Sequence, residues 1–221
     1  MSERPAVRLA VFDCDGTLAD GQAAVCAAME RAFARNDLPA PKRTAIRRIV
    51  GLSLPQAMAQ LAGEQAPETQ RALVAAYKEA FHEARLEGRL SEALFDGIEP
   101  LLRDVAAQGW QLGVATGKSD RGLAATLAAN GLSDLFATLQ TADRHPSKPH
   151  PSMLLAAMDQ ALAEPEDTVM IGDTVFDIEM ARAAGVRAIG VAWGYHEADE
   201  LLAAGAEAVV ATPRDLLALL A

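Results

Sequence analysis

Residues 7–17 read VRLAVFDCDGT, and this stretch decides the fold. The apolar run at 7–12 predicts a buried strand, and the glycine that follows predicts a turn directly after it. Side chains alternate along a strand, so Asp13 and Asp15 are expected to point the same way while Cys14 points into packing. Like charges held this close repel, so a cation, a lysine or a proton must neutralise one of them. The motif indicates a metal site or a proton-transfer role, although two acids that cap a turn would look the same.

From residue 97 onward, short apolar strands alternate with helical patterns. Strands are predicted at 110–115, 136–140, 168–172, 186–192 and 207–211. Helices are predicted at 97–108, 119–130, 151–162, 176–184, 197–204 and 213–220. Alternation of this kind favours a parallel sheet covered by helices on both faces, because parallel strands need crossover connections. We therefore expect an α/β fold with a doubly wound, Rossmann-like parallel-sheet core.

A helical insertion separates the first strand from this repeat. Residues 19–92 show helical periodicity and no convincing strand; one apolar stripe contains Val25 and Met29. The expected division is a core formed by residues 1–18 and 93–221, with the helical insertion at 19–92. The insertion holds as many basic as acidic side chains to within one residue, so the core carries the net negative charge.

Composition limits the classes of partner. The chain has 221 residues, 51% of them hydrophobic, and a net charge of −10. This charge argues against a nucleic-acid or membrane surface, because either would favour a basic patch. Its two cysteines, Cys14 and Cys26, provide no disulfide framework. No apolar run reaches about 18 residues and residues 1–5 lack the apolar core of a signal peptide, so we expect a cytoplasmic protein.

Polar side chains follow the ends of the predicted strands, where open α/β sheets bind ligands. Thr116 and Gly117 follow the second strand and precede a helix, and a hydroxyl with exposed N–H groups at a helix start can bind an anion. Lys148 lies between turn residues after the third strand. Asp173 ends the fourth, and Asp177 falls in the first helical turn after it. Each residue alone has an ordinary structural interpretation, but together they predict a site.

These segments, in this order, resemble the motifs of the haloacid dehalogenase superfamily, in its phosphoglycolate phosphatase-like branch. The resemblance covers essentially the whole chain, with the helical insertion resembling the small α-helical cap of that family. It implies that Asp13 is the nucleophile and Asp15 the general acid and base. It also implies that Mg²⁺ is held by the Asp13 carboxylate, the Asp15 backbone carbonyl and the Asp173 carboxylate, with Asp177 in the outer shell.

Phosphoryl transfer needs positioning and charge neutralisation, because the moving group spreads negative charge over its oxygens. We expect Lys148 and Thr116 to hold those oxygens, supported by the backbone N–H of Gly117. In the insertion, Arg47 and Gly51 lie one helical turn apart and are candidates for selecting the substrate.

The sequence therefore predicts a Mg²⁺-dependent phosphatase that hydrolyses a small phosphorylated metabolite, a phosphoglycolate-like phosphomonoester, through an aspartyl phosphate. A sugar-phosphate mutase would use the same residues. A receiver-type signalling domain also phosphorylates an aspartate near acids, a threonine and a lysine, but Asp15 would hasten the loss of its phosphate.

Other candidates are interpreted as structural. Lys118 is expected at the exposed surface, and the aromatic residues at 193–196 are expected to pack a loop. A phosphonate hydrolase with a Schiff-base lysine is disfavoured, because neither lysine of the insertion, Lys42 or Lys78, has an identifiable context.

Overall fold

A parallel sheet forms the centre of the computed structural model, which describes residues 6–221; the part of the expected core at 1–5 lies outside the described residues. The six strands stand in the order β5-β4-β1-β6-β7-β8. Their bounds are β1 Leu9–Phe12, β4 Gln111–Thr116, β5 Thr138–Thr141, β6 Thr168–Gly172, β7 Arg187–Val191 and β8 Ala208–Val210. All five pairings between neighbouring strands are parallel.

Helices cover both faces of this sheet, which confirms the predicted doubly wound α/β fold. The helices α5 (Ile98–Ala107), α6 (Asp120–Ala129) and α10 (Pro213–Leu220) pack on one face, and α7 (Ser152–Ala161), α8 (Val175–Ala183) and α9 (Ala198–Ala204) on the other. A short 3₁₀ helix, η1 (Pro165–Asp167), precedes β6. Side chains alternate along β1, so Phe12 packs in the apolar core on the first face of the sheet and Val11 in the apolar core on the second. Within the described residues, no helix has both the length and the apolar character needed to cross a membrane.

Strand β1 lies in the middle of the sheet, between β4 and β6. Its last residue, Phe12, is in register with Val114 of β4 and with Ile171 of β6. The chain adds β4 and β5 on one side of β1 and β6, β7 and β8 on the other, so the winding reverses at β1. Ligands in open α/β sheets bind beyond the strand ends at such a reversal. The topology therefore brings the segments after β1, β4 and β6 together.

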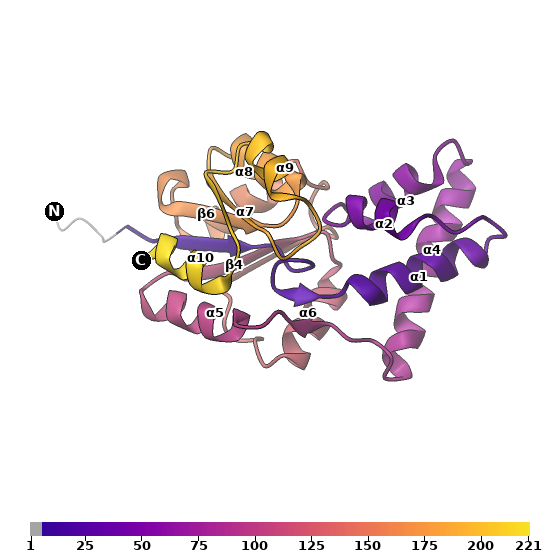
Figure 1. Cartoon of the computed structure of the whole chain (residues 1–221), viewed down its shortest axis with the longest axis horizontal. Coiled ribbons are helices and arrows are strands. Elements are labelled where there is room, and N and C mark those ends of the chain that lie inside the picture. Colours follow the sequence, from indigo (N-terminus) through magenta and orange to yellow (C-terminus); the bar gives the residue numbers. More distant parts are fainter. Residues whose placement is uncertain (1–5) are drawn as a thin grey trace.

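Four consecutive helices lie to one side of the sheet (Figure 1). They are α1 (Gln22–Ala34), α2 (Arg43–Ile49), α3 (Leu54–Ala62) and α4 (Pro67–Leu86). We call residues 19–92 the helical segment. It has its own apolar core, in which Met29, Met58 and Leu73 are buried. This core agrees with the predicted helical periodicity.

A two-stranded ribbon joins the helical segment to the rest of the chain. Strand β2 (Ala19–Asp20) pairs antiparallel with β3 (Ala93–Leu94), so the two connections lie side by side. The expectation that 19–92 contains no strand is wrong at β2. Two residues are too short to show the alternation by which a strand is recognised in a sequence.

Candidate active site

Asp13 follows β1 directly, and its side chain is buried. Its Oδ1 accepts a hydrogen bond from the backbone N–H of Cys14 at 2.6 Å and lies 3.0 Å from Nζ of Lys148. Its buried Oδ2 has no hydrogen-bond partner in the described part of the chain. Burial raises the pKa of Asp13 from 3.8 to about 7; the Lys148 ammonium opposes this shift, and the carboxylates of Asp177 and Asp15 add to it. An oxygen desolvated in this way needs a cation or a proton.

Asp173 follows β6 and is completely buried. Its Oδ1 accepts a hydrogen bond from the Thr17 hydroxyl at 2.8 Å, and its Oδ2 accepts one from the backbone N–H of Tyr195 at 2.9 Å. Burial raises the pKa of Asp173, and the charge of Asp13 adds to the shift. Gly16 makes the close approach possible: its φ is 88°, and a Cβ there would lie 2.2 Å from Asp173 Oδ2.

Lys148 is fully buried between two acids. Its Nζ lies 2.6 Å from Asp177 Oδ1 in addition to its contact with Asp13. Asp177 is also the third residue of α8, where its Oδ2 accepts hydrogen bonds from the N–H and hydroxyl of Thr174 in a capping box. Burial lowers the pKa of Lys148, but the two carboxylates outweigh this effect and hold it above the ordinary value. Lys148 is therefore a fixed positive charge beside Asp13.

The three buried acids are a suitable donor set for a hard cation. One carboxylate oxygen from each of Asp13, Asp173 and Asp177 lies within 4.8 Å of the others. Lys148 supplies one positive charge against three carboxylates, so the cluster retains excess negative charge. Mg²⁺ prefers oxygen ligands and uses one or two carboxylates. The residues present therefore fit the Mg²⁺ that the sequence predicts.

A cavity of about 460 Å³ lies between the strand ends and the helical segment. Asp13, Asp15, Thr116 and Gly117 line its core side, and Gly51 lines the opposite side. Thr116 is buried at the end of β4. The topology thus brings these predicted residues to one cavity, with Lys148, Asp173 and Asp177 buried next to Asp13.

The two candidates from the helical segment are placed differently. Gly51 lines the cavity, whereas Arg47 is absent from its lining. Gly117 meets the loop that contains Gly51: a Cβ on Gly117 would lie 2.5 Å from the carbonyl oxygen of Leu52 and 2.7 Å from that of Gly51. The glycine therefore allows backbone to pack on backbone where the helical segment meets the core.

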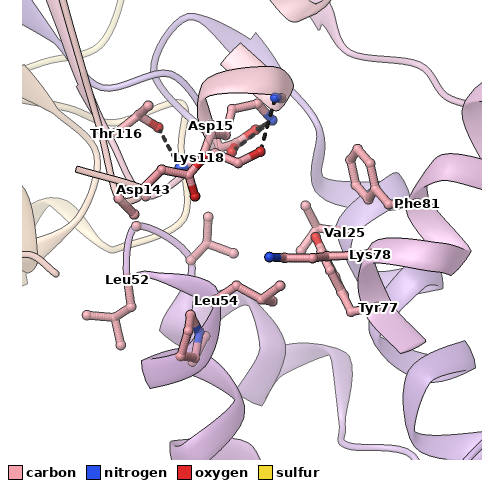
Figure 2. A pocket seen from close by; sticks show the side chains of 18 of the residues that line it. Asp15, Val25, Leu52, Leu54, Tyr77, Lys78, Phe81, Thr116, Lys118 and Asp143 are labelled. Carbon is pink, nitrogen blue, oxygen red and sulfur yellow. Dashed lines mark hydrogen bonds and ion pairs between the residues drawn. The ribbon is translucent and has the colours of Figure 1, made fainter. Parts of the chain in front are cut away.

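Lys118 is not at the exposed surface, so that prediction is wrong. Its side chain is 8% exposed, and Nζ lies 2.8 Å and 3.0 Å from the two carboxylate oxygens of Asp15 (Figure 2). Nζ also donates to Glu92 Oε1 at 2.6 Å. Burial lowers the pKa of Lys118, but Asp15 and other nearby anionic groups outweigh this effect and raise it. A lysine after Thr-Gly carries no signal of such pairing in the sequence.

The sequence interpretation also missed a role for Tyr195. Its backbone N–H orients Asp173, and its side chain is buried in the apolar cluster of the helical segment. A main-chain donor of this kind has no signature in residue type, because every residue except proline carries one.

Comparison with known proteins places these features in a family. Residues 10–191 match the model of the haloacid dehalogenase-like hydrolases. The chain belongs to this family. The match covers most of the chain and confirms the resemblance drawn from the motifs, together with the prediction of a hydrolytic enzyme.

Several relatives cover most of the chain. A protein named probable phosphatase IndB from Dickeya dadantii is 39% identical over 92% of this chain and 89% of its own length. A phosphoglycolate phosphatase from Pseudomonas putida is 28% identical over 95% of this chain and 78% of its own. The tyrosine-protein kinase PtkA from Mycobacterium tuberculosis is 33% identical over 87% of this chain, which spans 64% of that protein.

A solved structure has the same fold. The crystal structure of a protein named putative haloacid dehalogenase-like hydrolase, from Bacteroides fragilis, superposes with a TM-score of 0.87 at 25% identity. The superposition covers 95% of this chain and 99% of that one. The fold of this chain is therefore shared with that protein over nearly its whole length.

Proposed function

We propose that this chain is a Mg²⁺-dependent phosphatase that hydrolyses a small phosphorylated metabolite, a phosphomonoester such as phosphoglycolate, through an aspartyl phosphate on Asp13. One observation carries the proposal. Asp13 Oδ2 is a buried oxygen with no hydrogen-bond partner in residues 6–221, and Asp13 lines the cavity while its other oxygen is held by Lys148. A nucleophile needs such an arrangement, with one oxygen fixed and the other available.

In the first step, Asp13 Oδ2 attacks phosphorus, the bond from phosphorus to the leaving oxygen breaks, and Asp15 donates a proton to that oxygen. In the second, a water attacks the aspartyl phosphate and gives its proton to Asp15, while the bond from phosphorus to Asp13 breaks and phosphate leaves. Asp15 suits both steps because it lines the same cavity as Asp13 and is absent from the buried acid cluster.

The phosphoryl oxygens are assigned to three groups at the strand ends. They are the Thr116 hydroxyl and the Gly117 backbone N–H, from two residues that line the cavity, and the ammonium of Lys148, which lies 3.0 Å from Asp13. Each would stabilise negative charge during transfer. Asp177 serves in the outer shell, since its oxygens already hold Lys148 and the first turn of α8.

The Asp13 and Asp173 carboxylates and the backbone carbonyl of Asp15 would hold Mg²⁺. When bound, the ion neutralises charge so that two anions, the carboxylate and the phosphate ester, can approach each other.

The helical segment serves as a cap over a core formed by residues 1–18 and 93–221. The segment already contacts the core: the backbone N–H of Ser53 donates to the Ser147 hydroxyl at 2.7 Å, and Arg48 of α2 pairs with Glu200 at 2.5 Å. A closed cap excludes water and contacts the leaving group.

The test is turnover of a panel of phosphorylated metabolites with and without Mg²⁺, with trapping of labelled phosphoenzyme by acid quench. Hydrolysis that needs Mg²⁺ and label on Asp13 are expected. No phosphate release from any ester would overturn the proposal. Activation by a bisphosphorylated sugar, with the phosphoryl group returned to the product, would indicate a mutase. A phosphoenzyme stable for hours would indicate a receiver domain, and transfer to tyrosine would indicate a kinase.

A further inference from the structure

The wall that the helical segment contributes to the cavity is largely apolar. It is formed by the side chains of Val25, Met29, Leu54, Tyr77 and Phe81. The rings of Tyr77 and Phe81 stack, with centroids 5.6 Å apart and an angle of 27° between planes. Cavities of about 300–1,000 Å³ with apolar walls and a few polar groups bury drug-sized ligands, and this one has about 460 Å³. A two-carbon leaving group would leave most of this wall uncovered.

One cation of the cavity lining has no partner among the residues that the structure describes. Lys78 extends from α4 with its ammonium directed toward the loops of the core (Figure 2). Within the described residues, that ammonium forms neither an ion pair nor a side-chain hydrogen bond. Two other cations of the lining do: Arg85 lies 3.1 Å from Glu92, and Arg121 lies 3.0 Å from the His82 ring.

The acids of the lining are already engaged. Asp15 binds Lys118, and Asp143 accepts a hydrogen bond at 2.8 Å from the backbone N–H that begins α6. Asp13 is assigned to the phosphoryl group. Among residues 6–221, Lys78 therefore has no anionic partner. Its side chain is exposed and lines the cavity beside the apolar wall, so the anion of a ligand can pair with it through a charge-assisted hydrogen bond.

We propose that the substrate is a phosphomonoester whose leaving group combines a flat apolar body with a second anionic group, and that Lys78 binds that anion. The inference rests on the proposed phosphatase function and names its substrate class. The stacked wall covers the apolar body, the strand ends hold the phosphoryl group, and Lys78 binds the carboxylate or phosphate at the far end. Phosphoglycolate would supply the second anion but not the apolar body.

Three probes separate these features. Benzyl phosphate offers a ring, phosphoglycolate offers a carboxylate, and 4-carboxybenzyl phosphate offers both. The wild-type protein is expected to show its highest kcat/KM for 4-carboxybenzyl phosphate. Lys78→Met keeps the stem and removes the charge, so it should lower kcat/KM for the carboxylated ester by about tenfold, the size of a hydrogen bond to a charged group. It should change kcat/KM for benzyl phosphate by no more than about twofold, since that ester has no anionic group to pair with the Lys78 ammonium.

Lys42→Met is the matched control, because Lys42 is the other lysine of the helical segment, is exposed and lies outside the cavity lining. Lys42→Met should leave kcat/KM unchanged for both benzyl phosphate and 4-carboxybenzyl phosphate. The role of Lys78 would be overturned if Lys78→Met lowered kcat/KM equally for 4-carboxybenzyl phosphate and benzyl phosphate. It would also be overturned if the wild-type protein hydrolysed these two esters with equal kcat/KM. A higher kcat/KM for phosphoglycolate than for both benzyl esters would overturn the proposal that the leaving group has an apolar body. Failure of every ester in Mg²⁺ would instead overturn the proposed function, and the inference with it.

Discussion

Nζ of Lys118 donates to both carboxylate oxygens of Asp15, at 2.8 Å and 3.0 Å, across 103 residues of sequence. The two residues follow β4 and β1, which are neighbours in the sheet. Glu92, just before β3, fixes the same ammonium from the other side at 2.6 Å. The proposed acid and base is thus oriented by a lysine that is itself anchored to one of the two connections of the helical segment. We interpret Lys118 as a positioning residue for Asp15.

Replacing Lys118 by Met should lower kcat on an alkyl phosphate by about tenfold or more. A general acid or base contributes about 10²–10⁴-fold to the rate, and a misplaced Asp15 would lose part of that contribution. The loss should be smaller on p-nitrophenyl phosphate, whose leaving group needs no proton, and Lys118→Arg should recover part of the rate. Rates on the two esters provide the measurement.

A double-mutant cycle tests whether Lys118 acts through Asp15. Asp15→Asn alone should show the same dependence on leaving group, and adding Lys118→Met to it should cost little more. Independent losses that multiply would show that Lys118 only stabilises the fold or binds substrate directly.

Asp13→Asn should reduce turnover to background, because an amide oxygen is a poor nucleophile and the first step needs the carboxylate. The fold should survive, since Lys148 keeps Asp177 as its partner at 2.6 Å. Steady-state rates, acid-quench trapping of phosphoenzyme and a thermal melt are the measurements. Appreciable turnover by a folded Asn variant would remove Asp13 from the nucleophilic role.

Chelation of the metal should stop the reaction, and Asp173→Asn should raise the Mg²⁺ concentration needed for half-maximal rate, because it removes one of two carboxylate ligands. The Asn side chain can keep the hydrogen bond from Tyr195 through its carbonyl oxygen, so the loop should stay in place. Mg²⁺ titrations of the rate measure the effect. Full activity in excess chelator would exclude a metal mechanism.

Gly117→Ala tests the contact between cap and core. The added Cβ would lie 2.5 Å and 2.7 Å from the carbonyl oxygens of Leu52 and Gly51, and backbone cannot yield as a flexible side chain does. The loop at Gly51 should move away from the core, so KM should rise for every ester. Gly122→Ala, where a Cβ meets the Ser119 hydroxyl at 3.2 Å, is a milder control on the same loop and helix. Unchanged KM in Gly117→Ala would show that this contact does not shape the site.

Two features of the sequence account for the correct predictions: the hydrophobic pattern, which predicts the strands, and the polar residues that follow the strands, which predict the site. The core strands are apolar on both faces, so β6 is predicted at its observed bounds, and the rule for open sheets brings Asp13, Thr116 and Asp173 to one edge. The pairing of Lys118 could not be predicted, because its burial depends on Glu92, which comes from a distant part of the chain. Lys78 is an exposed helix lysine in the structure as well, and only the placement of α4 against the core shows that it lines the cavity.

The raised pKa of Asp13 links metal binding to stability. Burial moves this pKa from 3.8 to about 7, so between about pH 4 and pH 7 the folded protein holds a proton that the unfolded chain has lost. Without metal, the free energy of unfolding should therefore fall as pH rises through that window, because the contribution of Asp13 is favourable only at low pH.

Mg²⁺ binds the Asp13 carboxylate and competes with that proton. Saturating Mg²⁺ should thus raise Tm more at about pH 8 than at about pH 6, which thermal melts measure without reference to activity. Asp13→Asn, which leaves only the Asp173 proton for Mg²⁺ to displace, should show a smaller difference between the two pH values. An equal rise in Tm at both would contradict the linkage.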